Sequence, residues 1–283
     1  MNSTLGLDAA IDRWLREDIG DGDHTTIGTI PFDITGSAKI LVKEAGILAG
    51  LQLAERIFHR FDKNLHLELL KEDGASIQIG DVVLRVSGNI HSILQCERLV
   101  LNVMQRMSGI ATNTNSYVKL LKGTKAQILD TRKTTPGFRL PEKLAVKLGG
   151  GVNHRFGLND MILIKDNHID FAGGIAEAIR GTKAYLEANK MDLKIMVETR
   201  TLEDVSNVLA IGGIRRILLD NFSLELTREA VKLINNRVEI ESSGGITKDT
   251  VLSYAECGVD YISVGALTHK IESLDLSLKA DFS

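Results

Sequence analysis

The 283-residue chain lacks the features that mark secreted, membrane-spanning and nucleic-acid-binding proteins. Its two cysteines, Cys96 and Cys257, are too few for a disulfide framework. No apolar run approaches the roughly 18 residues that a membrane helix needs, and the stretch after Met1 has no basic segment of the kind that begins a signal peptide. The formal net charge of −3 disfavours a general nucleic-acid binder. We therefore expect a soluble, cytoplasmic protein that binds neither nucleic acid nor membrane.

Proline is also scarce, and its distribution points to one part of the chain. There are three prolines against 26 glycines, and Pro136 and Pro141 lie five residues apart. The same region concentrates positive charge, because the stretch from Arg132 to Arg155 holds six basic residues and one acidic residue, a local charge of +5. Arg and Lys bind carboxylates and phosphates. The cluster therefore indicates a site for a strongly anionic small molecule.

The first hundred residues predict a strand-rich α+β module, and a long helix follows it. Apolar residues recur at helical spacing in some segments and run or alternate as in strands in others. Helices are predicted over 8–19, 51–61 and 92–121, and strands over 37–43, 65–70 and 81–86. Gly109 lies inside the long helix, and we expect it to break or bend that helix.

The rest of the chain alternates short apolar strands with helices, which predicts a parallel sheet with helical crossovers. The strands are predicted over 126–130, 161–165, 194–198, 216–220, 238–241 and 261–264, and the helices over 141–149, 174–188, 201–210, 224–235 and 248–256. Thr201 with Asp204, and Thr247, are the predicted N-caps. Six strands in about 140 residues are too few for a complete eight-stranded barrel, which takes about 250 residues. The pattern therefore predicts an incomplete barrel.

These patterns give an α/β protein with three parts. Residues 1–110 are predicted to form an N-terminal α/β sandwich domain, and residues 111–270 an incomplete, TIM-like α/β barrel of about six strands. Residues 271–283 are predicted to pack back on the N-terminal domain.

Polar residues end or follow most of the predicted barrel strands. Five of the six strands end in, or run into, a charged residue, namely Asp130, Lys165, Glu198, Asp220 and Glu241. In barrels of this type the carboxyl ends of the strands open onto one face, where the active site lies. Strand ends also meet solvent in any fold, but so many charged residues in register, together with the basic cluster, favour an active site.

Two glycine-containing loops follow the last two predicted strands. Ser242-Ser243-Gly244-Gly245 comes after the fifth strand, and Val264-Gly265-Ala266-Leu267 after the sixth. Glycine lets backbone N–H groups approach a ligand, and barrels often hold a phosphate in this position. Between these loops and the basic cluster, Glu198 and Asp220 could bind Mg²⁺ or sugar hydroxyls, or form ion pairs with the cations. The spacing of His154, His168 and His269 does not indicate a zinc site.

Several longer motifs together resemble the quinolinate phosphoribosyltransferase (decarboxylating) family. They are Thr131-Arg132-Lys133-Thr134-Thr135-Pro136-Gly137, Gly149-Gly150-Gly151-x-Asn153-His154-Arg155, Ile164-Lys165-x-Asn167-His168, Leu219-Asp220-Asn221 and Ser243-Gly244-Gly245-Ile246. The resemblance spans essentially the whole chain. It implies the two-domain fold described above, and transfer of phosphoribosyl from phosphoribosyl pyrophosphate to quinolinate with decarboxylation. The products are nicotinate mononucleotide, pyrophosphate and CO₂, the reaction belongs to NAD biosynthesis, and Mg²⁺ is the implied cofactor.

The same resemblance implies roles for individual residues. Quinolinate carboxylates would be bound by Arg132, His154, Arg155 and Lys165, and the 5′-phosphate by Ser243, Gly244, Gly245, Gly265 and Ala266. Lys133, Glu198 and Asp220 would be catalytic, with Glu198 and Asp220 facing the ribose and the metal-bound pyrophosphate. Thr131, Leu267 and His269 complete the substrate-binding set. Arg98 would come from a neighbouring subunit, so the resemblance implies at least a homodimer.

Three other functions compete with this one. Lys165 at the end of a barrel strand could form a Schiff base, as in an aldolase. A paralogue with the same fold could transfer phosphoribosyl to a different ring substrate. A catalytically idle binding protein is the third, but it would not need both carboxylates among the cations.

Overall fold

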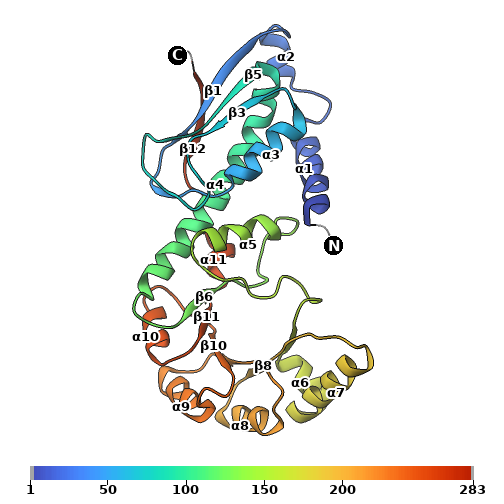
Figure 1. The fold of residues 1–283 in the computed structure, drawn as a ribbon, viewed down its shortest axis with the longest axis vertical. Coiled ribbons are helices and arrows are strands. Elements are labelled where there is room, and N and C mark those ends of the chain that lie inside the picture. The colour runs from blue at the N-terminus through green and yellow to red at the C-terminus, as the bar shows by residue number, and fades with distance from the viewer. Residues whose placement is uncertain (1–2, 282–283) are drawn as a thin grey trace. The chain divides into compact units, whose positions relative to one another are not determined.

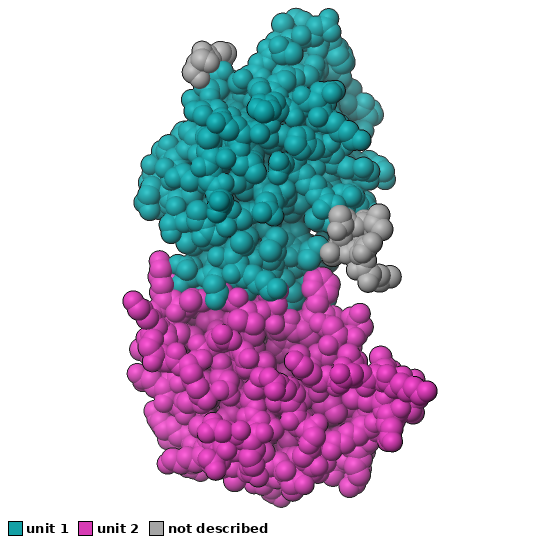
Figure 2. Space-filling view, in the orientation of Figure 1, with its two compact units in different colours: residues 1–115, 135–150, 270–283 teal, residues 116–134, 151–269 magenta. Residues whose placement is uncertain are grey.

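The structure is a computed structural model that describes residues 3–281. The chain forms two compact units, which Figure 2 colours separately. Unit 1 comprises residues 1–115, 135–150 and 270–283, and unit 2 comprises residues 116–134 and 151–269. Residues 1–2 and 282–283, at the ends of the predicted domain ranges, lie outside the described residues.

Unit 1 is built on an antiparallel sheet of four strands in the order β12-β1-β5-β3 (Figure 1). The strands are β1 (Thr35–Val42), β3 (His66–Leu69), β5 (Val82–Asn89) and β12 (Leu276–Asp281), with a short separate pair β2 (Gly46–Ile47) and β4 (Ser76–Ile77). The helices are α1 (Ser3–Ile19), α2 (His24–Thr29), α3 (Leu51–Phe61), α5 (Arg139–Leu148) and most of α4 (Ile90–Leu120). The last described strand, β12, therefore pairs with the first, β1.

The apolar spacing explains why α3 forms and which face it buries. Leu51, Ala54, Ile57 and Phe58 recur at intervals of three and four residues and are all buried. Their stripe is the core-facing side of an amphipathic helix. Gly50 precedes the helix at φ +96°, a conformation that favours glycine.

Helix α5 packs within unit 1, although the predicted domain ranges place its residues with the barrel. Glu142 of α5 is fully buried, and its Oε1 accepts hydrogen bonds from Arg106 of α4 at 2.6 and 2.8 Å. Its Oε2 accepts the Thr135 N–H at 3.1 Å. A buried carboxylate needs partners of this kind, and here they come from unit 1.

The long helix α4 is continuous through Gly109, so the helix does not break at this glycine, and a bend there stays a prediction. A Cβ atom at Gly109 would lie 2.1 Å from the carbonyl oxygen of Glu272. Glycine is therefore needed here for the close approach of the 270–283 segment.

Unit 2 contains a parallel sheet of six strands in the order β6-β11-β10-β9-β8-β7. The strands are β6 (Gln127–Leu129), β7 (Ile162–Ile164), β8 (Ile195–Thr199), β9 (Arg216–Asp220), β10 (Glu239–Ser243) and β11 (Tyr261–Ser263). The helices are α6 (Asp166–Ala172), α7 (Ile175–Ala188), α8 (Leu202–Ile211), α9 (Leu224–Ile234), α10 (Val251–Glu256) and α11 (Ala266–His269). Helices α7 to α10 follow one another in an arc outside the strands (Figure 1).

The two sheets confirm the predicted fold class of an N-terminal α/β sandwich domain joined to an incomplete α/β barrel. All six predicted strands occur, and the sheet is open between β6 and β7, which are consecutive in sequence but lie at opposite edges. All five residues of β8 are buried, as expected for a parallel strand covered on both faces.

One predicted N-cap is confirmed and the other is wrong. Thr201 and Asp204 form a reciprocal capping box at the start of α8, with hydrogen bonds of 3.1 and 3.0 Å. Helix α10 begins at Val251 and not after Thr247, because residues 248–250 form a turn in which the Thr250 hydroxyl accepts the Thr247 N–H.

Two helix glycines give a matched test of the packing in α4. Replacing Gly109 by Ala should lower the free energy of unfolding by about 1–3 kcal/mol, because the methyl group meets a backbone oxygen. At Gly181, inside α7, an added Cβ atom would have no neighbour within 4 Å, so Gly181→Ala should raise stability by about 0.5–1 kcal/mol. Urea unfolding of both variants measures the difference, and equal effects would contradict this account of Gly109.

Candidate active site

The carboxyl ends of the parallel strands surround a cavity of about 730 Å³ in unit 2. It is lined by most of the predicted site residues, which are Thr131, Arg132, Lys133, His154, Arg155, Lys165, Glu198, Asp220, Ser243, Gly244, Gly245, Gly265, Ala266 and His269. Parallel strands bring residues far apart in sequence to one edge of the sheet, which is why these positions converge.

Two predicted residues do not line the cavity. Leu267 is fully buried within α11. Arg98 is exposed on α4 in unit 1.

The cavity also contains residues that were not among the predicted site residues. They are Leu163, Leu218, Asn221, Glu241, Ile246, Thr247, Ser263 and Val264. Glu241 had a signal in the sequence, since it ends a predicted strand. Leu163 and Leu218 belong with Met196 to a buried apolar cluster, and nothing in an apolar strand pattern shows which residue faces a ligand.

The loop after β6 is held so that its two cations face the cavity. The Thr131 hydroxyl accepts the Lys133 N–H at 3.0 Å, and the Thr268 hydroxyl donates to the Lys133 carbonyl at 2.8 Å. The Arg132 Nε atom is buried and has no hydrogen-bond partner among residues 3–281. A buried donor without a partner is costly, so this guanidinium is suited to bind an anion.

The segment that carries His154 and Arg155 lies along the open edge of the sheet beside β6. Val152 forms a parallel bridge with Leu129, and Asp130 accepts the His154 N–H at 2.8 Å. Arg155 reaches toward the other open edge, where it donates to the Met161 carbonyl just before β7 at 3.1 Å. Backbone pairing thus turns the chain so that both side chains line the cavity.

Electrostatics in this segment favour a bound anion. Burial and the neighbouring charge of Arg132 lower the pKa of Arg155, and Asp160 opposes this effect. A guanidinium whose charge is disfavoured by burial and by a neighbouring cation is stabilised when an anion binds beside it.

The acidic residues of the cavity lie at the ends of neighbouring strands. Glu198 is the last residue but one of β8, with only 8% of its surface exposed, and its Oε2 lies 3.7 Å from the Lys165 ammonium group. Burial raises the pKa of Glu198, Lys165 opposes the rise, and the like charge of Asp220 at the end of β9 adds to it. The pKa of Glu198 is therefore influenced by both a cation and a second carboxylate.

Glycine is required in the loop after β10. Gly244 has φ +99°, and a Cβ atom there would lie 2.1 Å from the Asn221 amide oxygen. Gly245 also has positive φ. Near the other loop, a Cβ at Gly265 would lie 3.1 Å from His269 and 3.2 Å from Lys133. Side chains at these positions would fill the space where a phosphate could meet the backbone.

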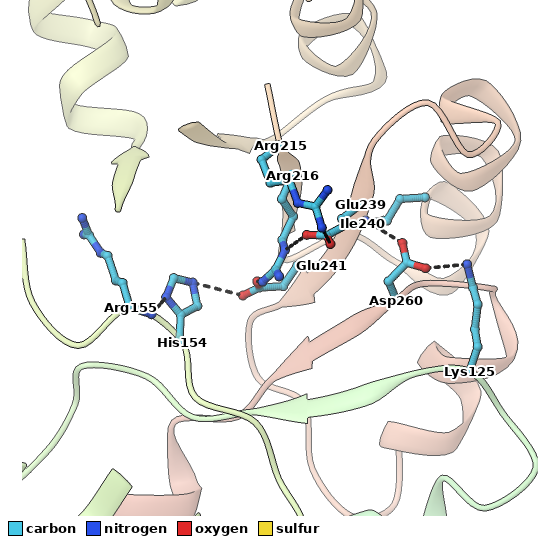
Figure 3. A network of polar contacts seen from close by, with 9 residues as sticks. All are labelled: Lys125, His154, Arg155, Arg215, Arg216, Glu239, Ile240, Glu241 and Asp260. Carbon is cyan, nitrogen blue, oxygen red and sulfur yellow. Dashed lines mark hydrogen bonds and ion pairs between the residues drawn. The ribbon is translucent and has the colours of Figure 1, made fainter. Parts of the chain in front are cut away.

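Glu241, which lines the cavity, belongs to a network of acids and arginines (Figure 3). Glu241 of β10 is fully buried, and Arg216 of β9 donates to its Oε2 at 2.8 Å. Arg216 also pairs with Glu239 at 3.1 Å and lies over the Tyr261 ring. Burial raises the pKa of Glu241, and the Arg216 charge opposes that rise.

Family models match nearly the whole chain. The N-terminal domain of quinolinate phosphoribosyl transferase matches residues 23–108, and the C-terminal domain matches residues 110–279. The chain belongs to the quinolinate phosphoribosyltransferase family. This confirms the resemblance carried by the sequence motifs.

Relatives and solved structures agree with the family. The chloroplastic nicotinate-nucleotide pyrophosphorylase [carboxylating] of Arabidopsis thaliana is 46% identical over 98% of this chain and 84% of its own length. A probable nicotinate-nucleotide pyrophosphorylase of Synechocystis is 40% identical over 96% of this chain and 92% of its own length. The crystal structure of NadC from Streptococcus pyogenes is 39% identical with a TM-score of 0.93, covering 99% of this chain and 97% of that one.

Two findings bear on metal binding and on the membrane. Residues 3–281 contain no group of three or more His, Cys, Asp or Glu side chains placed to hold a metal ion by themselves. In the same part of the chain, every helix is too short or too polar to cross a membrane.

The environment of Glu198 gives two variants with opposite expected shifts. Lys165→Met removes the cation that favours the carboxylate, so the pKa of Glu198 should rise further. Asp220→Asn removes a like charge, so the pKa should fall. Carbon-13 NMR titration of labelled glutamate, assigned with Glu198→Gln, measures both, and shifts in the same direction would contradict the arrangement.

Proposed function

We propose that this cavity carries out the reaction of the family through the residues that line it. The enzyme transfers phosphoribosyl from phosphoribosyl pyrophosphate to quinolinate with decarboxylation, and it forms nicotinate mononucleotide, pyrophosphate and CO₂. The observation that carries the assignment of residues is the single cavity that combines clustered cations, two carboxylates and glycine loops. One substrate is a dicarboxylate and the other carries several phosphate charges, so each needs the cations.

Each part of the cavity has a proposed partner. Arg132, His154, Arg155 and Lys165 bind the quinolinate carboxylates, and Lys133 lies between that pocket and the sugar phosphate. The backbone of the loops at Gly244 and Gly265 binds the 5′-phosphate, with His269 nearby.

The chemical step then needs no covalent nucleophile. The pyridine nitrogen attacks the anomeric carbon as pyrophosphate leaves, and the transition state has the character of an oxocarbenium ion. Glu198 and Asp220 stabilise the developing positive charge, and the cations fix the ring in position for attack. Once the nitrogen is quaternised, the bond between the adjacent ring carbon and its carboxylate breaks and CO₂ leaves. The electron pair stays on that carbon, stabilised by the cationic nitrogen, and a proton from solvent then completes nicotinate mononucleotide.

Mg²⁺ fits this site as an ion that arrives with the substrate. Glu198 and Asp220 are two carboxylates, and Mg²⁺ is often bound by one or two carboxylates together with substrate phosphates and water. The ion would offset the negative charge of the pyrophosphate.

Assembly and location are further parts of the proposal. Arg98 is exposed on α4, and we propose that it contributes to the active site of a second copy, so that the enzyme works as a homodimer or a larger assembly. We also propose that the enzyme is cytoplasmic.

The competing functions lack this kind of support. The relatives named above are named for this reaction, so nothing supports a paralogue that acts on another ring substrate. Lys165 forms an ion pair with Glu198 and lines the cavity together with several other cations, an arrangement that suits an anionic substrate better than the carbonyl substrate of an aldolase.

Removing single cations tests the residue assignment. Arg132→Ala and Lys165→Ala should each lower kcat/KM at least about a hundredfold, the scale expected for losing a charged contact to substrate. Lys147→Ala is the matched control, because Lys147 is an exposed cation of the same basic stretch outside the cavity. All three variants should stay folded by circular dichroism, and near-normal kinetics in the first two would overturn the assignment.

The substrate is tested by measuring products. Release of pyrophosphate and CO₂ is expected with quinolinate and phosphoribosyl pyrophosphate, and no turnover is expected with nicotinate in place of quinolinate. Activity with nicotinate but not with quinolinate would contradict the proposed substrate, although the protein would still be a phosphoribosyltransferase.

Metal removal tests the proposed cofactor. Chelation with EDTA should abolish turnover, and excess Mg²⁺ should restore it. Full activity in EDTA would contradict the proposal.

A further inference from the structure

Glu241 is a buried acid in the cavity wall to which the proposed mechanism gives no role. Its Oε2 accepts from Arg216, whereas its Oε1 has no hydrogen-bond partner among the described residues. Nε2 of His154 lies 3.7 Å from that second oxygen. Figure 3 shows the His154 ring between Arg155 and Glu241, with Arg216 on the far side of the carboxylate.

The other ring nitrogen of His154 is already engaged. Its Nδ1 accepts the backbone N–H of Arg155 at 2.7 Å, so Nδ1 carries no proton. In a neutral imidazole the single ring proton must then be on Nε2, the nitrogen that faces Glu241. The ring thus connects the carboxylate to the backbone of a cavity-lining arginine.

We propose that Glu241 is a positioning residue, which acts through the His154 ring to orient the backbone of Arg155. The proposal rests on the proposed function in so far as Arg155 binds substrate, and it gives His154 a positioning role in place of the direct contact with quinolinate proposed above. Links of 2.8, 3.7 and 2.7 Å run from Arg216 through Glu241 and His154 to the Arg155 N–H. The middle link is longer than a hydrogen bond, and such contacts often tighten when substrate binds.

A carboxylate is the side chain that this position needs. Arg216 and the Nε2–H of His154 are both donors, so the group between them must accept at both of its oxygens. A glutamine has only one acceptor oxygen, so its amide NH₂ would face one of the two donors, Arg216 or the Nε2–H of His154. The isosteric amide should therefore favour the tautomer with the proton on Nδ1, which cannot accept the Arg155 N–H.

Glu239 provides a matched control on the same strand. It accepts from Arg216 at 3.1 Å and also pairs with Arg215, so it too lies between two donors. It does not line the active-site cavity. Glu239→Gln and Glu241→Gln thus each remove one negative charge beside Arg216, but only Glu241→Gln changes the group that faces His154.

The test measures the His154 tautomer and the kinetics of both variants. Nitrogen-15 NMR of the seven labelled histidines, with His154 assigned by its loss in His154→Gln, reports which ring nitrogen is protonated. We expect the Nε2–H form in the wild type and in Glu239→Gln, and a shift toward the Nδ1–H form in Glu241→Gln. The KM for quinolinate should rise about tenfold in Glu241→Gln but not in Glu239→Gln. The kcat and the KM for phosphoribosyl pyrophosphate should change less than about twofold, because the lost contact binds the substrate and the transition state equally.

Two results would overturn the proposal. One is equal effects of the two substitutions on the tautomer and on KM, because both would then act only through Arg216. The other is a proton on Nδ1 in the wild-type enzyme, a measurement that holds even if Glu241→Gln does not fold. Neither depends on Arg132 or Lys165, so failure of the proposed function is distinguished by the kinetics of those variants.

Discussion

Clustered positive charge is the physical constraint on which the active site depends. Burial and the nearby charge of Arg132 lower the pKa of Arg155, and the Arg132 Nε atom is buried with no hydrogen-bond partner among the described residues. Such a cluster is unfavourable by itself and becomes favourable when an anion is bound. The fold must therefore hold the cations in place before the ligand arrives.

Much of unit 2 can be understood as the means of holding them. Each cationic segment is fixed through its backbone: Thr268 holds the Lys133 carbonyl, and Asp130 holds the His154 N–H. Arg155 itself reaches from the segment beside β6 to the carbonyl before β7, across the open edges of the barrel. The incomplete barrel thus provides the space in which a binding segment, in place of further strands, lines the cavity.

Local sequence patterns predicted the elements well where the physical signal was local. The six buried strands, the capping box at Thr201 and the long α4 all follow from apolar periodicity or from short-range hydrogen bonds. The expected break at Gly109 does not occur. Glycine is needed there because the backbone oxygen of Glu272 lies too close for a side chain, and no local sequence pattern reveals such a distant contact. The helices α6 and α11 were missed because they have only seven and four residues, too few for an apolar stripe to recur at helical spacing.

The sequence by itself determined the family, the reaction and the set of residues that can bind anions, because motifs and charge are properties of the chain order. Only the tertiary structure decided which of these residues meet. It placed Glu241 3.7 Å from the Nε2 atom of His154, left Leu267 inside α11, and brought the carboxyl ends of β8 and β9 together so that the charge of Asp220 helps to raise the pKa of Glu198. Those relations depend on strand order and on the direction of side chains across a sheet, which pair residues that are distant along the chain.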